Sequence, residues 1–183
     1  MVMRVRILPV GEIDESILLR VAHDLTQVFP ETTCRVDERL ALPEKAFDEK
    51  RRQYSSNFIL ARVQAYAAKT KDTNRVLGMV DADIFVPELN FVFGEAANPG
   101  IAALISLWRL KPEFYGSPPE KEVLAERSVK EAVHEIGHTL GLRHCPRSSC
   151  VMHFSNSVFD TDRKSLFCDD CYLQVSLAID SLK

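Results

Sequence analysis

The chain has 183 residues, of which 46% are hydrophobic and 27% are charged, the balance of a globular protein with a packed core. Lys and Arg number 23 against 26 Asp and Glu, so the formal net charge is −3 and the basic excess typical of nucleic-acid-binding proteins is missing. The apolar runs are shorter than the ~18 residues of a membrane span, and residues 1–10 lack a signal-peptide pattern, so we expect a cytoplasmic protein that binds neither nucleic acid nor membrane.

Strand and helix patterns alternate in the first part of the chain. Residues 1–10 alternate with a period of two and predict a strand. Residues 14–29 carry apolar side chains three and four positions apart and predict a helix. A second strand is expected within residues 32–42, and a second helix within residues 47–69.

Three further strands are expected before the last third of the chain. Residues 75–86 give the strongest strand pattern, and residues 91–97 and 101–110 give two more after turn residues. This alternation implies a mixed, twisted sheet with flanking helices, so the expected fold class is α/β. We expect a single domain, with residues 1–141 as a sheet-and-helix part that includes the active-site helix, and residues 142–183 as a smaller lower part.

The last third begins with a long helix, expected over about residues 119–140. Ser128 and Glu131 have the spacing of a capping box, so the helix is expected to start or restart there. Residues 141–168 show few regular patterns and are expected to be irregular. Residues 170–182 predict a closing helix.

A histidine motif lies at the end of the long helix and reads His-Glu-Ile-Gly-His-Thr-Leu-Gly-Leu-Arg-His. His134 and His138 are four residues apart, so both imidazoles lean from one helix face and can reach one zinc ion. Glu135 then lies beside the metal without ligating it. Gly141 suits the left-handed residue that commonly ends a helix, after which His144 can return as a third ligand. Three protein ligands leave one position for water, as in catalytic zinc sites.

This motif predicts hydrolysis of an amide bond. Zinc lowers the pKa of its bound water towards ~7 and polarises a substrate carbonyl. Glu135 would take the proton of that water, direct it at a peptide carbonyl and pass the proton to the leaving amine. The alternatives are a helix whose histidines are satisfied in the core, or a zinc-stabilised binding protein with little or no peptidase activity. Glu135 favours the enzyme, because a structural metal site has no need of an acid there.

A cluster of four cysteines follows the histidine motif. Cys145 and Cys150, then Cys168 and Cys171, have the spacing of a tetrahedral structural zinc site. Such a metal would stabilise a small lobe with little core of its own. Two disulfides and unrelated buried thiols are the alternatives. Nucleic-acid binding through this cluster is disfavoured by the acidic charge balance.

Together these residues resemble the archaemetzincins, a family of metzincin metallopeptidases. The resemblance rests on His134-Glu135-x-x-His138-x-x-Gly141-x-x-His144, then Cys145, Cys150, Met152 and Cys168-x-x-Cys171. It implies a metzincin-like fold with a zinc-stapled C-terminal lobe. It also implies two zinc ions per chain: a catalytic one at the three histidines, with Glu135 as base and Met152 as an apolar floor beneath the metal, and a structural one at the four cysteines.

The resemblance further implies a peptide or protein substrate and an endopeptidase or aminopeptidase-like activity; we expect a monomer. In metzincins an antiparallel edge strand bounds the cleft and pairs with the substrate. By that analogy a peptide would align along Phe93, Gly94, Glu95 and Ala96, with a plain sheet strand as the alternative. His153 is expected to be a turn histidine, with a metal ligand or a substrate contact as alternatives.

Overall fold

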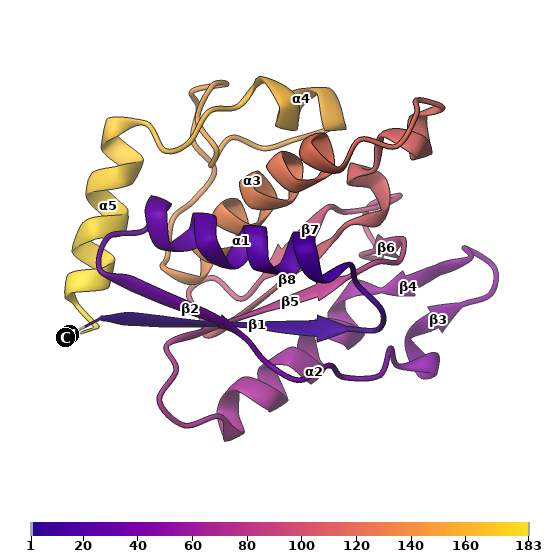
Figure 1. The fold of residues 1–183 in the computed structure, drawn as a ribbon, viewed down its shortest axis with the longest axis horizontal. Coiled ribbons are helices and arrows are strands. Elements are labelled where there is room, and N and C mark those ends of the chain that lie inside the picture. Colours follow the sequence, from indigo (N-terminus) through magenta and orange to yellow (C-terminus); the bar gives the residue numbers. More distant parts are fainter. Residues whose placement is uncertain (1, 183) are drawn as a thin grey trace.

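A five-stranded sheet runs through the middle of the molecule in a computed structural model that describes residues 2–182 (Figure 1). Its strand order is β2-β1-β5-β8-β7. Four of these strands are parallel, and only the edge strand β7 runs antiparallel, against β8. The five strands are β1 (Met3–Val10), β2 (Thr32–Val36), β5 (Arg75–Val80), β7 (Gly94–Ala96) and β8 (Ala102–Ser106).

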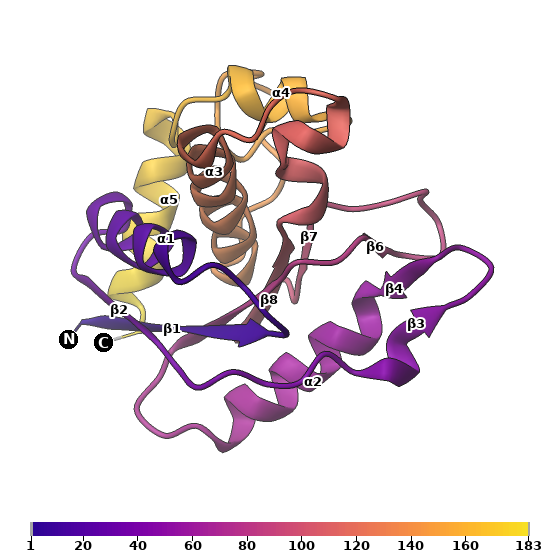
Figure 2. The same ribbon diagram turned by 45° about the vertical axis from the view of Figure 1, so that its right-hand side comes forward.

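Helices cover both faces of this sheet (Figures 1 and 2). One face packs against α1 (Glu15–Val28), α3 (Lys121–Thr139) and α5 (Asp169–Asp180), and the other face packs against α2 (Ser56–Lys69). The short helix α4 (Val158–Arg163) packs on α3. The expected α/β class, with a mixed sheet and flanking helices, is confirmed.

A smaller sheet and three one-turn helices complete the described part of the chain. The small sheet has the order β3-β4-β6 and lies beside the amino-terminal end of α2 (Figure 1). These elements are β3 (Phe47–Asp48), β4 (Gln53–Ser55), β6 (Ile84–Phe85), and the 3₁₀ helices η1 (Glu44–Ala46), η2 (Trp108–Leu110) and η3 (Pro112–Tyr115). Within residues 2–182, no helix combines the length and the apolarity needed to cross a membrane.

The central strands are buried on both faces, which explains their apolar sequences. In β1, Val5 and Ile7 point into the core beneath α1 and α3, whereas Leu8 and Val10 point into the core beneath α2. Every residue of β5 and β8 is buried. The period of two therefore sorts side chains between two cores, and α3 is held firmly against one of them.

Two expected strands end earlier than their apolar patterns predict. The strand expected over residues 75–86 ends at Val80, because Asp81 and Asp83 form ion pairs with Lys111 and Arg109. The chain then continues as β6 in the other sheet. The strand expected over residues 101–110 likewise ends at Ser106, and the 3₁₀ helix η2 follows. The strands expected at 32–42 and 91–97 are also shorter.

The predicted helix start near Ser128 is wrong, because α3 is continuous from Lys121 to Thr139. The Ser128 hydroxyl donates to the carbonyl of Leu124 within the helix, 2.6 Å away, and so caps nothing. The actual capping box lies at Ser157 and Asp160, where it begins α4 in a segment expected to be irregular. The closing helix is confirmed as α5.

We expect a leucine-to-alanine substitution to destabilise the protein much more in the buried core than on the exposed surface of a helix. Leu77→Ala empties a fully buried site in β5 and should lower the free energy of unfolding by about 2–5 kcal/mol. Leu19 lies on α1 and is 56% exposed, so Leu19→Ala should change this free energy by less than about 0.5 kcal/mol. Urea unfolding of both variants measures this difference, and equal losses would contradict the assigned core.

Candidate metal centres

Three imidazoles converge at the carboxyl end of α3. His134 and His138 project from successive turns of the helix, and His144 comes from the segment that follows it. Their candidate ligand atoms lie within 4.8 Å of one another, and the Nε2 atoms of His134 and His138 are 3.0 Å apart. Zn–N bonds of about 2.0–2.1 Å in tetrahedral geometry place nitrogens about 3.3–3.4 Å apart. The three donors therefore fit one zinc ion.

The end of α3 turns the chain back towards these histidines. Gly141 has a φ of +93°, a left-handed conformation that a glycine adopts without strain. The N–H of Gly141 donates to the carbonyl of His138, and the N–H of Leu142 donates to that of Gly137, at 2.9 and 3.1 Å. This pair of bonds is a Schellman motif. It returns the chain sharply enough for His144 to face the helix.

Backbone carbonyls orient the two helical histidines. With Nδ1 protonated, His134 donates to the carbonyl of Val151 at 2.7 Å, and His138 donates to that of Leu142 at 2.8 Å. The side-chain amide of Asn98 donates to the same Leu142 carbonyl at 2.9 Å. Hydrogen bonds of this kind fix the tautomer of a metal ligand. Both Nε2 atoms are thereby left available to a metal.

Burial sets the charge state of the groups in this site. Desolvation lowers the pKa of all three histidines, most strongly that of His134, and so favours the neutral imidazole that binds metal. Burial also raises the pKa of the Glu135 carboxyl well above its ordinary value, and Glu131 and Glu95 act in the same direction. A cation between the imidazoles would oppose that rise by favouring the ionised carboxylate.

Two glycines allow close packing around Glu135 and Met152. A Cβ added at Gly94 would lie 2.7 Å from both Cγ and Oε1 of Glu135, so the edge strand β7 touches this side chain directly. A Cβ added at Gly137 would lie 2.6 Å from Sδ of Met152. Met152 is fully buried against the helix turn between the two helical histidines.

A cleft of about 370 Å³ opens over the histidines. It is bounded by β7 and the segment before it, by α3, and by the chain after Met152. The four residues expected to align substrate all line this cleft, and β7 is the edge strand on this side of the five-stranded sheet. The lining residues are Leu89, Asn90, Phe91, Val92, Phe93, Gly94, Glu95, Ala96, Glu131, His134, Glu135, His138, His144, Phe154, Ser155 and Asn156.

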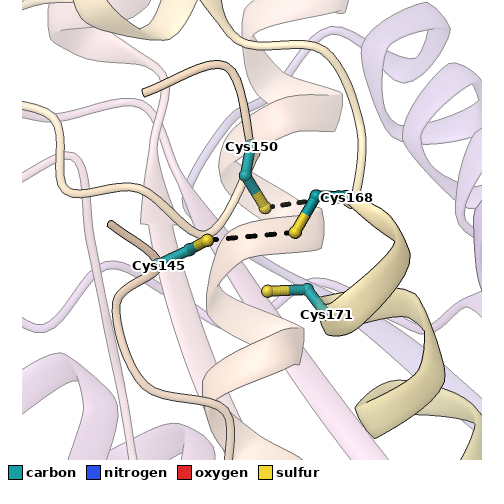
Figure 3. A group of neighbouring side chains, drawn as sticks. All are labelled: Cys145, Cys150, Cys168 and Cys171. Carbon is teal, nitrogen blue, oxygen red and sulfur yellow. Dashed lines mark hydrogen bonds between the residues drawn. The ribbon is translucent and has the colours of Figure 1, made fainter. Parts of the chain in front are cut away.

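The four clustered cysteines point their sulfurs at one another (Figure 3). The sulfurs lie within 4.8 Å of one another, and those of Cys145 and Cys168 are 3.9 Å apart. Tetrahedral Zn–S bonds of about 2.3 Å place sulfurs about 3.8 Å apart, so the group fits a zinc ion. All four are free thiols. A hydrogen bond from the backbone of Cys171 lowers the pKa of the Cys168 thiol to about 7, towards the thiolate that binds metal, whereas burial raises the pKa of the Cys145 and Cys171 thiols.

The two candidate ligand groups share one turn of chain. Cys145 directly follows His144, and its N–H donates to the Met152 carbonyl at 2.9 Å. With Nδ1 protonated, the His153 ring donates to the carbonyl of Cys145 at 2.8 Å and braces this turn. Val151, whose carbonyl holds His134, directly follows Cys150. The four-cysteine group therefore supports the segments that orient two of the three histidines.

The sequence pattern placed Glu131 at a helix start, whereas in the structure Glu131 lines the cleft. Glu131 is only 3% exposed and lies on the same face of α3 as His134 and Glu135. Its spacing of three and four residues from those two was the available signal. The lining residues after Met152 gave no such signal, because that segment is irregular.

Comparisons with known proteins agree over almost the whole chain. A family model described as peptidase family M54 matches residues 4–176, which include both ligand groups. An archaemetzincin of Pyrococcus abyssi (strain GE5 / Orsay) is 44% identical over 171 residues, 90% of each chain. The crystal structure of archaemetzincin from Methanopyrus kandleri is 36% identical, covers 98% of this chain and 96% of its own, and has a TM-score of 0.85. A zinc-dependent peptidase from Methanocorpusculum labreanum (strain Z) is 27% identical, with coverages of 93% and 99% and a TM-score of 0.85.

The contact between Gly94 and Glu135 predicts a specific packing penalty. Gly94→Ala should lower the free energy of unfolding by about 1–3 kcal/mol, because the new methyl group would overlap Glu135 and the Leu104 carbonyl. In the Glu135→Ala background the overlap with Leu104 alone remains, so the penalty should be smaller by about 1 kcal/mol. Urea unfolding of the metal-free variants completes this double-mutant cycle. An unchanged penalty would mean that Glu135 does not contact residue 94.

Proposed function

The chain belongs to peptidase family M54, the archaemetzincins, as its motif predicted, and we propose that this zinc metallopeptidase hydrolyses peptide bonds with Glu135 as general base. One observation carries the proposal. The Glu135 carboxylate is 6% exposed, lines the cleft beside three convergent imidazoles, and has no hydrogen-bond partner among residues 2–182. A buried carboxylate that no protein group binds is free to exchange a proton with water or substrate.

The three imidazoles would hold the catalytic zinc in this proposal. Zinc at that position supplies Lewis-acid chemistry, which acidifies water and polarises a carbonyl oxygen. His134 and His138 are held in place by their backbone hydrogen bonds, and the more exposed His144 completes the donor set from the returning chain. Met152 would form the apolar floor of this site.

Glu135 would accept the proton of the attacking water and then donate it to the leaving amine. Its place in the low-dielectric cleft suits both steps, because burial raises the pKa of this carboxyl, whereas a zinc ion held by the three histidines would favour its ionised form. Gly94 permits the carboxylate to approach the edge strand without obstruction. The backbone of residues 93–96 would align an extended peptide by strand addition.

The four cysteines would hold a second, structural zinc ion. Four sulfur donors with no open position are typical of such sites. Because the cysteines brace the segments that orient His134 and His144, metal at the cysteines would also favour metal binding at the histidines.

Substitution of Glu135 tests the proposed mechanism. Glu135→Gln keeps the shape of the side chain but removes its ability to exchange protons, so kcat should fall by about 10²–10⁴-fold. Zinc content, measured by elemental mass spectrometry, should stay unchanged. Glu126→Gln, on the exposed side of the same helix, should retain full activity against a library of quenched fluorescent peptides. If the zinc-loaded wild type cleaves no peptide of that library, a binding protein with little activity is indicated.

Metal content tests the two sites independently of activity. After zinc loading and desalting, the wild type should hold two zinc ions and His138→Ala should hold one. Cys168→Ser should lose the cysteine-bound zinc and bind the remaining ion more weakly, whereas Cys34→Ser, outside the cluster, should keep both. A wild type that holds one zinc, unaffected by His138→Ala, would contradict the histidine site.

A further inference from the structure

Glu131 presents a free carboxylate oxygen to the cleft. The residue lies one helical turn before Glu135, is 3% exposed and lines the cavity. Its Oε1 accepts a hydrogen bond from the Thr161 hydroxyl at 2.8 Å, which fixes the side chain against α4. Its Oε2 has no hydrogen-bond partner within the described part of the chain. It is not among the side-chain oxygens that are sealed from solvent, so a positively charged group of a ligand in the cleft can reach it.

The rest of the cleft offers no counter-charge to this carboxylate. Among its described lining residues there are three acids, Glu95, Glu131 and Glu135, and no Lys or Arg. Glu95 is bound by the Ser56 hydroxyl at the start of α2, and Glu135 is assigned to proton transfer. Glu131 is therefore the lining carboxylate left for substrate recognition.

The charges of Lys164 and Lys130 act on Glu131, and that of Lys164 also acts on Glu135, but neither lysine forms an ion pair with these carboxylates. Lys164 is 4% exposed and does not line the cleft. Within residues 2–182, neither carboxylate forms an ion pair within 4.0 Å. A cation that reached the free Oε2 from the cleft would thus make the close contact that Lys164 does not make.

The walls around Glu131 suit a long cationic side chain. Phe93 and Phe154 line the same cavity, and Phe91 stacks edge-on against Phe93 with ring centroids 5.2 Å apart. Lys and Arg side chains bury their methylene stems on such apolar surface while the charged end reaches a polar group. Ser155 and Asn156 add polar groups to the same lining.

From this geometry we infer that Glu131 is a specificity-determining residue, which binds the Lys or Arg side chain of a peptide substrate within the cleft. The inference rests on the proposed peptidase function, because it assigns the occupant of the same cleft. Oε2 accepts the charge-assisted hydrogen bond, while the bond from Thr161 to Oε1 holds the acceptor in position.

The test compares N-acetylated, quenched fluorescent peptides in which one position at a time carries Lys or its neutral analogue norleucine. At one position, the wild-type kcat/KM should favour Lys about tenfold or more, the size of one charge-assisted hydrogen bond. In Glu131→Gln, whose amide oxygen can still accept from Thr161, that ratio should fall to within about threefold. Glu126→Gln should keep the wild-type ratio. Zinc content and Tm of all variants are measured alongside.

The possible outcomes separate this inference from the proposed function. Cleavage by the wild type without a preference for Lys at any position, or a preference retained by Glu131→Gln, overturns the role of Glu131 and leaves the peptidase intact. If no peptide is cleaved, the proposed function fails, and binding of the same labelled peptides to the zinc-loaded protein decides the inference. Tighter binding of Lys peptides that Glu131→Gln abolishes supports it, and equal binding of Lys and norleucine peptides overturns it.

Discussion

The unbroken course of α3 is the constraint on which both the fold and the site depend. Its apolar face packs beneath the sheet, and its other face carries Glu131, His134, Glu135 and His138 in two successive turns. The same helix cannot restart within this stretch without rotating these side chains relative to one another. Its glycine-terminated end then sets the direction of the chain that supplies the third histidine. A rigid helix held against one core of the sheet therefore fixes the relative positions of the polar groups.

The chain after α3 packs into the main core and is also tied to α3 and α5 by polar and sulfur contacts. Arg127 binds Asp162 through two hydrogen bonds of 2.7 and 2.8 Å, and Thr161 binds Glu131, so α4 is tied to α3. The four cysteines tie the next segment to the start of α5. Because this part of the chain supports Val151 and Met152, the order of the histidine site is coupled to it. Three of the four cysteines lie in the main core together with Val151, Met152, Val175 and Ile179, so the cluster adds a crosslinking point to the apolar contacts of this segment.

The cleft combines an edge strand, an acidic helix face and aromatic walls. A parallel sheet that ends in one antiparallel strand leaves that strand's outer edge beside α3, and Gly94 allows the two to touch. The lining of the cleft contains the carboxylates of Glu95, Glu131 and Glu135, whereas Arg109, which lies outside this lining, forms an ion pair with Asp83. The proposed chemistry and the proposed selectivity thus arise from one arrangement, in which buried acids line the cleft and Glu131 and Glu135 form no close ion pair with a protein cation among residues 2–182.

The sequence by itself indicated the two groups of candidate ligands, because their spacing is local: one helical turn separates His134 from His138, and a glycine at the helix end returns His144. It also determined the α/β class, because two-sided burial leaves apolar strands between amphipathic helices. Only the tertiary structure decided where strands ended, since ion pairs of Asp81 and Asp83 with distant residues interrupt an apolar run. It alone placed Glu131 in the cleft, because a carboxylate becomes part of a cleft only when α4 and β7, far away in the chain, pack around it.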